Sequence, residues 1–409
     1  MKRIFAVALG ILTAIGGFVD IGDLVTNAVV GSRFGLALAW VVVVGVVGIC
    51  LFAQMSGRVA AVSGRATFEI IRERLGPRAG LANLAASFLI NLLTVTAEIG
   101  GVALALQLAS SVEPMLWVPV AAFAVWVVIW RARFDLLENV TGLIGLALLV
   151  FVVALFLLSP DWGVLGGQAL TPTVPSGESP ATYWFYAVAL FGAAMTPYEV
   201  FFFSSGAIEE RWTEKDLATS RANVLVGFPL GGLLSIAIAG CAAVVLLPQA
   251  IEVTSLSQVV LPVAEAGGKI ALAFALVGIL AATFGAALET TLSSGYTLAQ
   301  FFGWSWGKFR RPASAARFHL SMIIVVVIAV AILATGVDPI QVTEYSVVFS
   351  AVALPLTYLP ILIIANDREY MGDKVNGRVM NAVATVYLVI ILVAAIAAIP
   401  LLIVTGAGA

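Results

Sequence analysis

The sequence has little charge, and this scarcity excludes most classes of soluble protein. Charged side chains make up 11% of the 409 residues and hydrophobic ones 61%, whereas about 25% of the residues are charged in a typical soluble domain. The mean hydropathy is +1.08. Such a chain lacks the polar residues needed to cover a water-exposed surface. The composition therefore predicts a polytopic membrane protein.

Cysteine and histidine are also scarce. Cys50 and Cys241, the two cysteines, lie inside apolar runs, so we expect small core residues rather than a disulfide or a thiol site. His319, the single histidine, begins a predicted span beside Arg317, where an interfacial position is expected. The net charge of −2 and the lack of a soluble domain argue against a nucleic-acid partner. Neither a resident cofactor nor an obligate protein partner is evident.

Apolar runs long enough to cross the lipid bilayer recur along the whole chain. A spanning helix needs about 20 apolar residues to cross roughly 30 Å of hydrocarbon. The runs predict eleven spans, near residues 4–31, 36–62, 82–110, 115–130, 136–158, 182–205, 222–247, 266–301, 317–335, 341–365 and 379–404. The chain is thus expected to be all-α.

The basic residues predict the orientation of these spans. All but two of the 21 Lys and Arg fall in alternate connections, counted from the N-terminus; the exceptions are Arg33 and Lys269. Basic residues that flank spans are retained on the cytoplasmic side. We therefore predict a cytoplasmic N-terminus and, after an odd number of spans, an external C-terminus, in a plasma-membrane protein.

The spans form two groups, each beginning with an interrupted helix. A long Gly, Pro and Ser-rich connection divides a single transmembrane domain, 1–409, into repeat one (about 1–160), repeat two (about 180–366) and an extra helix (about 379–404). The interruptions are "GGFVDIGD" in the first span and "GAAMTPYE", with its helix-breaking Pro197, in the sixth. Because each repeat has five spans, the two insert with opposite orientation. Paired breaks of this kind indicate an inverted-repeat transporter with its site at the midplane.

Acidic residues inside the spans are the main candidates for chemistry. They are Asp20, Asp23, Glu98, Glu199 and Glu289. An acid at the centre of a span costs roughly 2.5–3.5 kcal/mol, so each one needs a reason. One of Asp20 and Asp23 could cap the second half of the broken helix. A cap needs only one Asp, so the pair, together with Thr196 and Glu199 at the second break, favours a divalent-cation site.

The available ligand atoms indicate the type of metal. Carboxylates, the Thr196 hydroxyl and a backbone carbonyl near Ala193 are hard oxygen donors, which suit magnesium, calcium or manganese better than copper or zinc. Met195, beside the second break, is the one soft donor. The alternative role for Met195 is that of a flexible core residue.

Two further acids have alternative roles. Glu98 is either a proton carrier or partner of the ion, or a protonated residue that packs a broken helix against Gly100 and Gly101. Glu289, in a polar strip of the eighth span, either lines the inner exit or bonds to neighbouring helices.

These motifs resemble the Nramp family of divalent metal transporters, which has a LeuT-type fold. "DIGD" at 20–23 is similar to the family's first-helix motif Asp-Pro-Gly-Asn, and "TPY" at 196–198 to its sixth-helix motif Met-Pro-His. "TAEIGG" is similar to the third helix, and "SVVFSAVALPLTYLPILIIANDREYMGDKVNG" to the tenth helix and the loop after it. The resemblance covers nearly the whole chain. It implies two inverted five-helix repeats plus an eleventh helix, with the first and sixth helices broken.

The departures from the family pattern bear on the ion. By resemblance, Asp23 replaces the family's metal-binding Asn and Thr196 its Met, so the site gains an acid and loses a thioether that selects transition metals. The family's proton route uses two acids and a histidine, which correspond to Val95, Glu98 and Tyr198 here. Two of the three titratable groups are thus missing. The pattern resembles the Nramp-related magnesium transporters, in which the ion is thought to keep part of its water shell and to move without proton coupling.

The sequence therefore predicts alternating-access transport of divalent cations, magnesium first and manganese also, without obligatory proton coupling. The predicted metal ligands are Asp20, Asp23, Ala193, Thr196 and Glu199; the candidates for carrying a proton or supporting the ligands are Glu98, Tyr198 and Glu289. No enzyme activity is expected.

Three alternatives stay open at this point. A proton-coupled manganese or iron importer of the Nramp type would need Met195 to reach the ion. A sodium-coupled carrier of organic solutes shares the broken-helix plan, but two acids at the site would repel a carboxylate substrate. An intramembrane aspartyl protease would need a Gly-x-Gly-Asp motif, and "DIGD" lacks the first glycine.

Overall fold

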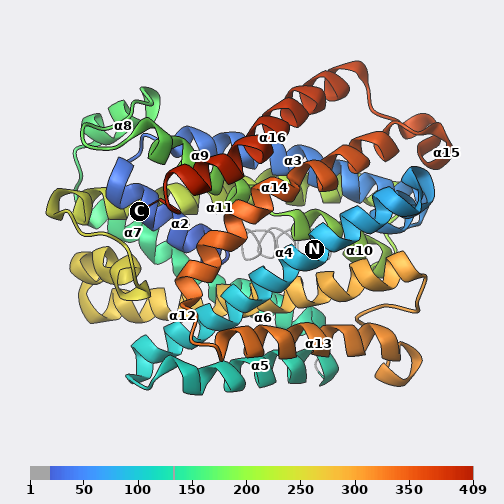
Figure 1. The fold of residues 1–409 in the computed structure, drawn as a ribbon, viewed down its shortest axis with the longest axis horizontal. Coiled ribbons are helices and arrows are strands. Elements are labelled where there is room, and N and C mark those ends of the chain that lie inside the picture. The colour runs from blue at the N-terminus through green and yellow to red at the C-terminus, as the bar shows by residue number, and fades with distance from the viewer. Residues whose placement is uncertain (1–18, 132–133, 409) are drawn as a thin grey trace.

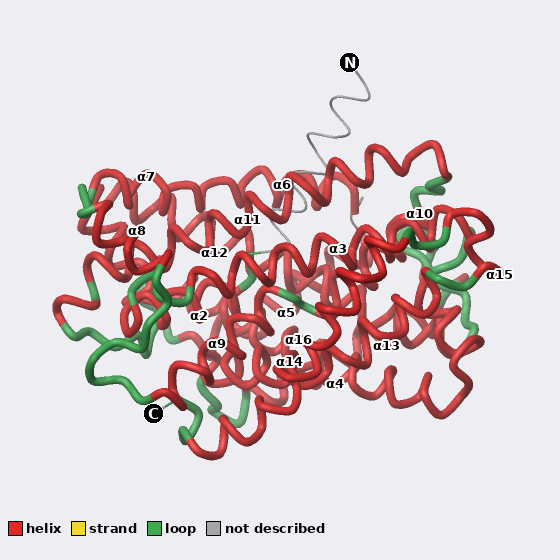
Figure 2. The backbone as a smooth tube through the Cα atoms, turned by 90° about the horizontal axis from the view of Figure 1, so that it is seen from above, coloured by secondary structure: helices red, strands yellow, loops and turns green. Residues whose placement is uncertain are grey.

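The computed structural model describes residues 19–131 and 134–408, and it has no β-strand in that part of the chain (Figure 2). Its longer helices are α2 (Ile21–Phe34), α3 (Ala39–Ser63), α4 (Thr67–Ser110), α5 (Pro114–Arg131), α6 (Phe134–Gly145), α7 (Val150–Leu157), α8 (Trp162–Leu170), α9 (Pro180–Ala194), α10 (Pro197–Glu209), α11 (Leu217–Val245), α12 (Leu256–Phe302), α13 (Ala316–Leu333), α14 (Pro339–Ala365) and α16 (Arg378–Val404). Short elements are α15 (Arg368–Met371) and the 3₁₀ turns η1 (Leu146–Leu149), η2 (Glu214–Asp216), η3 (Leu247–Gln249), η4 (Pro312–Ser314) and η5 (Gly372–Lys374).

Ten segments of the described chain are long and apolar enough to cross a membrane. They correspond to the second through eleventh predicted spans, with α6, η1 and α7 together forming the fifth and α9 with α10 the sixth. The first predicted span, 4–31, lies mostly outside the described residues, and its described part belongs to α2. The structure thus confirms the all-helical, polytopic plan.

Two helices begin well before the predicted span boundaries. The spans expected at 82 and 266 are preceded by helical segments that start at Thr67 in α4 and Leu256 in α12. In each case a glycine with positive φ, Gly76 (φ 83°) or Gly268 (φ 63°), breaks the helical geometry between the segment and the span. The hydropathy of the runs located the spans and missed these helical extensions.

α2, α9 and α10 lie between longer helices that cross the molecule (Figure 1). α4 packs against α12 and α14, while α2 packs against α11 and α9. Small residues allow the closest approaches. A Cβ on Gly31 would lie 2.2 Å from the Ala239 carbonyl oxygen, and one on Gly192 would lie 2.3 Å from that of Val347. Glycine is therefore required where α2 meets α11 and where α9 meets α14.

Arg33, one of the two basic residues on the predicted external side, is neutralised by a partner. Its guanidinium forms an ion pair of 2.7 Å with Glu178, in the connection before α9, and contacts the Gly408 carbonyl. These contacts link the end of α2 to the start of the second repeat and to the C-terminal segment. The charge of Arg33 is thereby accounted for without placing it on the cytoplasmic side.

Candidate functional site

Asp20 stands at the start of α2, where the sequence predicts the break in the first helix; the predicted first half of that helix lies outside the described residues. Asp20 lies in extended conformation (φ −94°, ψ −177°) as the N-cap of α2, and its Oδ1 accepts a hydrogen bond of 2.8 Å from the Asp23 amide. The side chain is buried, and the Tyr198 hydroxyl also donates to it. Asp20 therefore does cap α2, and its carboxylate faces the second break through Tyr198.

Asp23 is fully buried and held by two side chains that the sequence did not single out. Its Oδ1 accepts a hydrogen bond of 2.8 Å from Asn27, and its Oδ2 accepts one from Ser235 of α11. Asn27 stands four residues after Asp23 on the same helix face, a spacing that could have identified it. Ser235 is distant in sequence, and only the packing of α11 on α2 brings it near.

The second break separates α9 from α10. Met195 (φ −117°, ψ 53°) and Thr196 (φ −60°, ψ 123°) are non-helical, and Pro197 begins α10. Ala193 lies in the last turn of α9, where carbonyls lack intrahelical donors. Thr196 is buried at the N-cap of α10, and its side chain makes no capping hydrogen bond. The break thus presents the Thr196 hydroxyl, which lies near the Glu199 carboxylate, and backbone oxygens.

Met195 turns its thioether toward α3. A Cβ on Gly48 would lie 2.7 Å from its Sδ, so the sulfur packs directly on the α3 backbone. Its carbonyl oxygen accepts a hydrogen bond of 3.2 Å from the Tyr358 hydroxyl. In this structure Met195 therefore fills space between helices, which was the alternative to its role as a soft ligand.

Glu199 is the most unusual of the acids. It lies in the first turn of α10 and is 6% exposed, and neither carboxylate oxygen accepts a hydrogen bond of normal geometry, although the Thr196 hydroxyl lies near it. Its nearest charged neighbours are other acids, Glu289 and Asp20, which repel it. A buried carboxylate without donors is costly unless a cation or a proton compensates it.

Glu98 links α4 to the first break. Its Oε1 accepts a hydrogen bond of 3.2 Å from the Ile21 amide, the first amide of α2, while Oε2 has no partner. A Cβ on Gly101 would lie 3.1 Å from the Ile21 side chain, so the glycine permits this close contact. Glu289, half-buried in α12, is near enough to Glu98 for repulsion.

These placements bring the predicted residues together at the two breaks, on α2, α4, α9, α10 and α12. In the described part of the chain, no three His, Cys, Asp or Glu side chains surround a common metal position. A metal ion at the breaks would therefore take part of its shell from backbone carbonyls, hydroxyls or water.

Two other titratable residues lie away from the breaks. Glu344 of α14, which the sequence did not indicate, lines a cavity of about 10 Å³ with Thr26 of α2, enough space for about one water molecule. His319 lies in α13, with Nε2 3.1 Å from the Arg310 carbonyl oxygen. It takes no part in the site.

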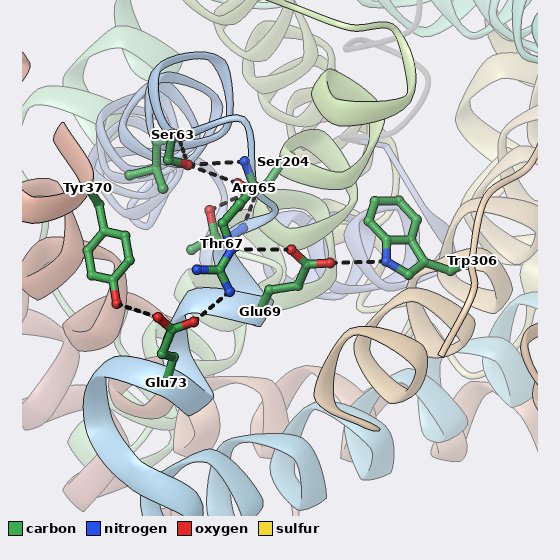
Figure 3. Close-up of polar contacts among 9 residues, drawn as sticks. Ser63, Arg65, Thr67, Glu69, Glu73, Ser204, Trp306 and Tyr370 are labelled. Atoms are coloured by element: carbon green, nitrogen blue, oxygen red, sulfur yellow. Dashed lines mark hydrogen bonds and ion pairs between the residues drawn. The ribbon is translucent and has the colours of Figure 1, made fainter. Parts of the chain in front are cut away.

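A polar network joins α10 to the turn between α3 and α4 (Figure 3). The Thr67 amide donates to Ser204 Oγ at 2.9 Å, and the Thr67 and Ser204 hydroxyls are also 2.9 Å apart. Ser56 of α3 donates to the Val200 carbonyl at 2.7 Å. Figure 3 shows Arg65 next to this cluster, paired with Glu73 at 2.6 Å. The half of the broken helix that carries Glu199 is thus fixed to α3 and α4.

The loop around α15 is attached to the first part of α4. Tyr370 donates to Glu73, and Arg74 contacts Asp367. The backbone amide of Glu369 and the Arg74 guanidinium hold the pKa of the Asp367 carboxyl below its usual range. Asp367 therefore stays ionised, and the attachment persists, across the physiological pH range.

Comparisons with known proteins decide the family. The model of the Nramp family, described as "Natural resistance-associated macrophage protein-like", matches residues 10–400. The chain belongs to the Nramp family. Relatives include the "Divalent metal cation transporter MntH" of Verminephrobacter eiseniae, 27% identical over 383 residues (90% of this chain, 83% of the relative). The MntH of Deinococcus radiodurans is 27% identical over 392 residues, which cover 92% of this chain and 85% of the relative.

Solved structures agree with the fold. A manganese transporter of Eremococcus coleocola, solved with an aromatic bis-isothiourea compound, superposes with a TM-score of 0.73 at 20% identity, covering 95% of this chain and 85% of that one. Mhp1, a nucleobase-cation-symport-1 family transporter, superposes with a TM-score of 0.59 at 17% identity, covering 96% of this chain and 91% of that one. The Nramp chain therefore has the LeuT-type fold predicted from the paired breaks. It is a multi-pass membrane transporter and not an enzyme, which removes the aspartyl protease from the alternatives.

Proposed function

We propose that this Nramp-family chain carries divalent metal cations across the membrane by alternating access, with magnesium as the main substrate and manganese also accepted. The relatives named as divalent metal cation transporters and the manganese transporter structure support the general activity. The proposed ligands are Asp20, Asp23, Glu199, the Thr196 hydroxyl and the Ala193 carbonyl, directly or through water. The ion is cargo, and no resident cofactor is proposed.

The observation that carries this proposal is the unpaired carboxylate of Glu199. It is buried beside Asp20 at the breaks, and neither oxygen accepts a hydrogen bond of normal geometry, although the Thr196 hydroxyl lies near it. A divalent cation would offset the repulsion between these acids, and its passage would be favoured inward by about 4.6 kcal/mol per 100 mV of membrane potential.

The donor set supports magnesium over transition metals. Every proposed donor is oxygen, and the one thioether nearby, Met195, lies against Gly48 of α3. Magnesium prefers oxygen ligands and keeps several of its waters. A site with carbonyl, hydroxyl and few converging acids suits such a partly hydrated ion.

Transport without obligatory proton coupling is proposed from the same residues. Tyr198 replaces the family's histidine, and its hydroxyl is engaged with Asp20. Glu98 gives one oxygen to the Ile21 amide, which supports a structural role for this acid. The second candidate, a proton-coupled manganese importer, is favoured by the manganese transporter among the structural neighbours.

The test is uptake into proteoliposomes that hold a magnesium-sensitive and a pH-sensitive dye, with manganese in a parallel set. Magnesium entry without acidification of the lumen is the expected result. Manganese entry with acidification, and no magnesium entry, would instead establish the proton-coupled importer and mean that Met195 rotates into the site. Dependence on sodium would contradict both.

A further inference from the structure

An apolar cavity lies on the outside of the molecule, between α5, α12 and α13. Its volume is about 250 Å³, and its walls include Trp126, Trp130, Thr291, Ala316, His319 and Ile323. α5 and α13 lie side by side along one edge of the protein, remote from the broken helices at the centre (Figure 1). Drug-sized ligand pockets are larger, roughly 300–1,000 Å³, so the cavity suits part of a slender apolar chain.

One end of this cavity is strongly basic. Arg311 and Arg317 adjoin the lining residues Pro312 and Ala316, and Arg131 adjoins Trp130. The Arg310 carbonyl is 3.1 Å from His319 in the cavity wall.

The segment that carries most of these arginines contains no acid. The sequence has no Asp or Glu between residues 303 and 337. Within the described residues, Arg131, Arg310 and Arg311 form no ion pair and are exposed. An anionic group is therefore the complementary ligand.

Aromatic residues indicate the depth of the cavity in the membrane. Trp126 and Trp130 line it, and Trp130 is 48% exposed. Trp304, in the connection that carries the arginines, lies under Arg317 at 5.7 Å. Tryptophans and arginines are concentrated at the headgroup level of a bilayer. The basic end thus lies at the interface and the apolar part extends into the hydrocarbon.

We propose that this cavity binds an anionic glycerophospholipid of the leaflet that faces the basic side of the protein. One acyl chain lies between Trp126, Ala316 and Ile323, and the phosphate lies among Arg131, Arg310, Arg311 and Arg317. The bound lipid contacts α5, α12 and α13 at once. This inference does not depend on which ion the protein carries.

The test uses the purified full-length protein in mild detergent, titrated with phosphatidylglycerol or phosphatidylcholine that carries brominated acyl chains. Bromine quenches tryptophan fluorescence on contact. We expect phosphatidylglycerol to quench at a concentration at least fivefold below that of phosphatidylcholine. Trp130→Phe should reduce the amplitude of this quenching, because Trp130 lines the cavity and is partly exposed.

Variants identify the headgroup site. Near an anionic lipid each arginine contributes about fivefold in affinity. The double variant Arg310→Gln/Arg311→Gln should therefore raise the phosphatidylglycerol concentration at half-maximal quenching, the midpoint, close to that of phosphatidylcholine. Arg368→Gln, which removes an exposed charge on α15, is the matched control and should leave it unchanged. Equal midpoints for the two lipids in the native protein would overturn the proposal. So would an unchanged midpoint in the double variant, or an equal effect of Arg368→Gln.

Discussion

The two aspartates of the first break differ in what already binds them. Asp20 accepts hydrogen bonds from the Asp23 amide and the Tyr198 hydroxyl, whereas Asp23 is held on both oxygens by Asn27 and Ser235. An oxygen that accepts a hydrogen bond keeps a further lone pair for a cation. Asp23 is therefore oriented by its neighbours, and Asp20 faces the second break.

The charge of Asp20 can be separated from its capping role. Asn is as good an N-cap as Asp, so Asp20→Asn should keep α2 intact while it removes the negative charge. We expect magnesium uptake in proteoliposomes to fall at least tenfold, with thermal stability changed little. Asp161→Asn, at the N-cap of α8, is the matched control and should transport normally. Normal uptake by the Asp20 variant would mean that the ion binds elsewhere.

Ser235 should act on the ion through Asp23. Ser235→Ala removes the donor to Asp23 Oδ2 and leaves the carboxylate less firmly oriented. Losing a residue that orients a metal ligand costs roughly 10–100-fold in affinity, so the KM for the transported cation should rise about tenfold, with Vmax less affected. Ser321→Ala, which removes a buried hydroxyl bonded within α13, provides the comparison. An unaltered KM would show that the orientation of Asp23 does not matter.

At the scale of elements, the start of α2 at Asp20 and the break between α9 and α10 decide which groups are available for binding. Helix breaks inside a membrane must have their free amides and carbonyls satisfied. Glu98 satisfies the Ile21 amide and Tyr358 the Met195 carbonyl, so the breaks are supported by α4 and α14. Motion of the broken helices would have to exchange these partners.

The hydrogen bonds between α10 and α4 should stabilise the arrangement seen here. Ser204→Ala leaves the buried Thr67 amide without its acceptor, a loss of about 1–3 kcal/mol. We expect the melting temperature in detergent to fall by a few degrees. The fall should exceed that of Ser294→Ala, whose hydroxyl bonds only within α12. If the two variants melt together, the network in Figure 3 contributes nothing to stability.

At the scale of the whole molecule, the distribution of basic residues predicts the orientation in the membrane. Fusing alkaline phosphatase after the C-terminal helix α16 should give an active enzyme, because that end is predicted to be external. A fusion at Lys374, in the loop before α16, should be inactive, since its flanks carry Arg368 and Arg378. The reverse pattern would invert the predicted orientation of every span.

The sequence by itself determined the class and the plan of this protein. Hydropathy located most ends of the ten described spans to within a few residues, because crossing hydrocarbon requires long apolar helices, but it missed the early starts of α4 and α12. The acids of "DIGD" and the Pro197 break were visible because charge and proline are costly inside such helices. Family membership could be inferred from the same motifs.

Only the tertiary structure decided what surrounds those residues. Ser235, Tyr358 and Glu344 are distant in sequence from the breaks and carry no local signal. Their roles follow from helix packing, which small residues such as Gly31 and Gly192 make close enough for contact. The direction of the Met195 thioether likewise depends on α3, because a side chain at an unwound break is oriented by what packs against it and not by its helix.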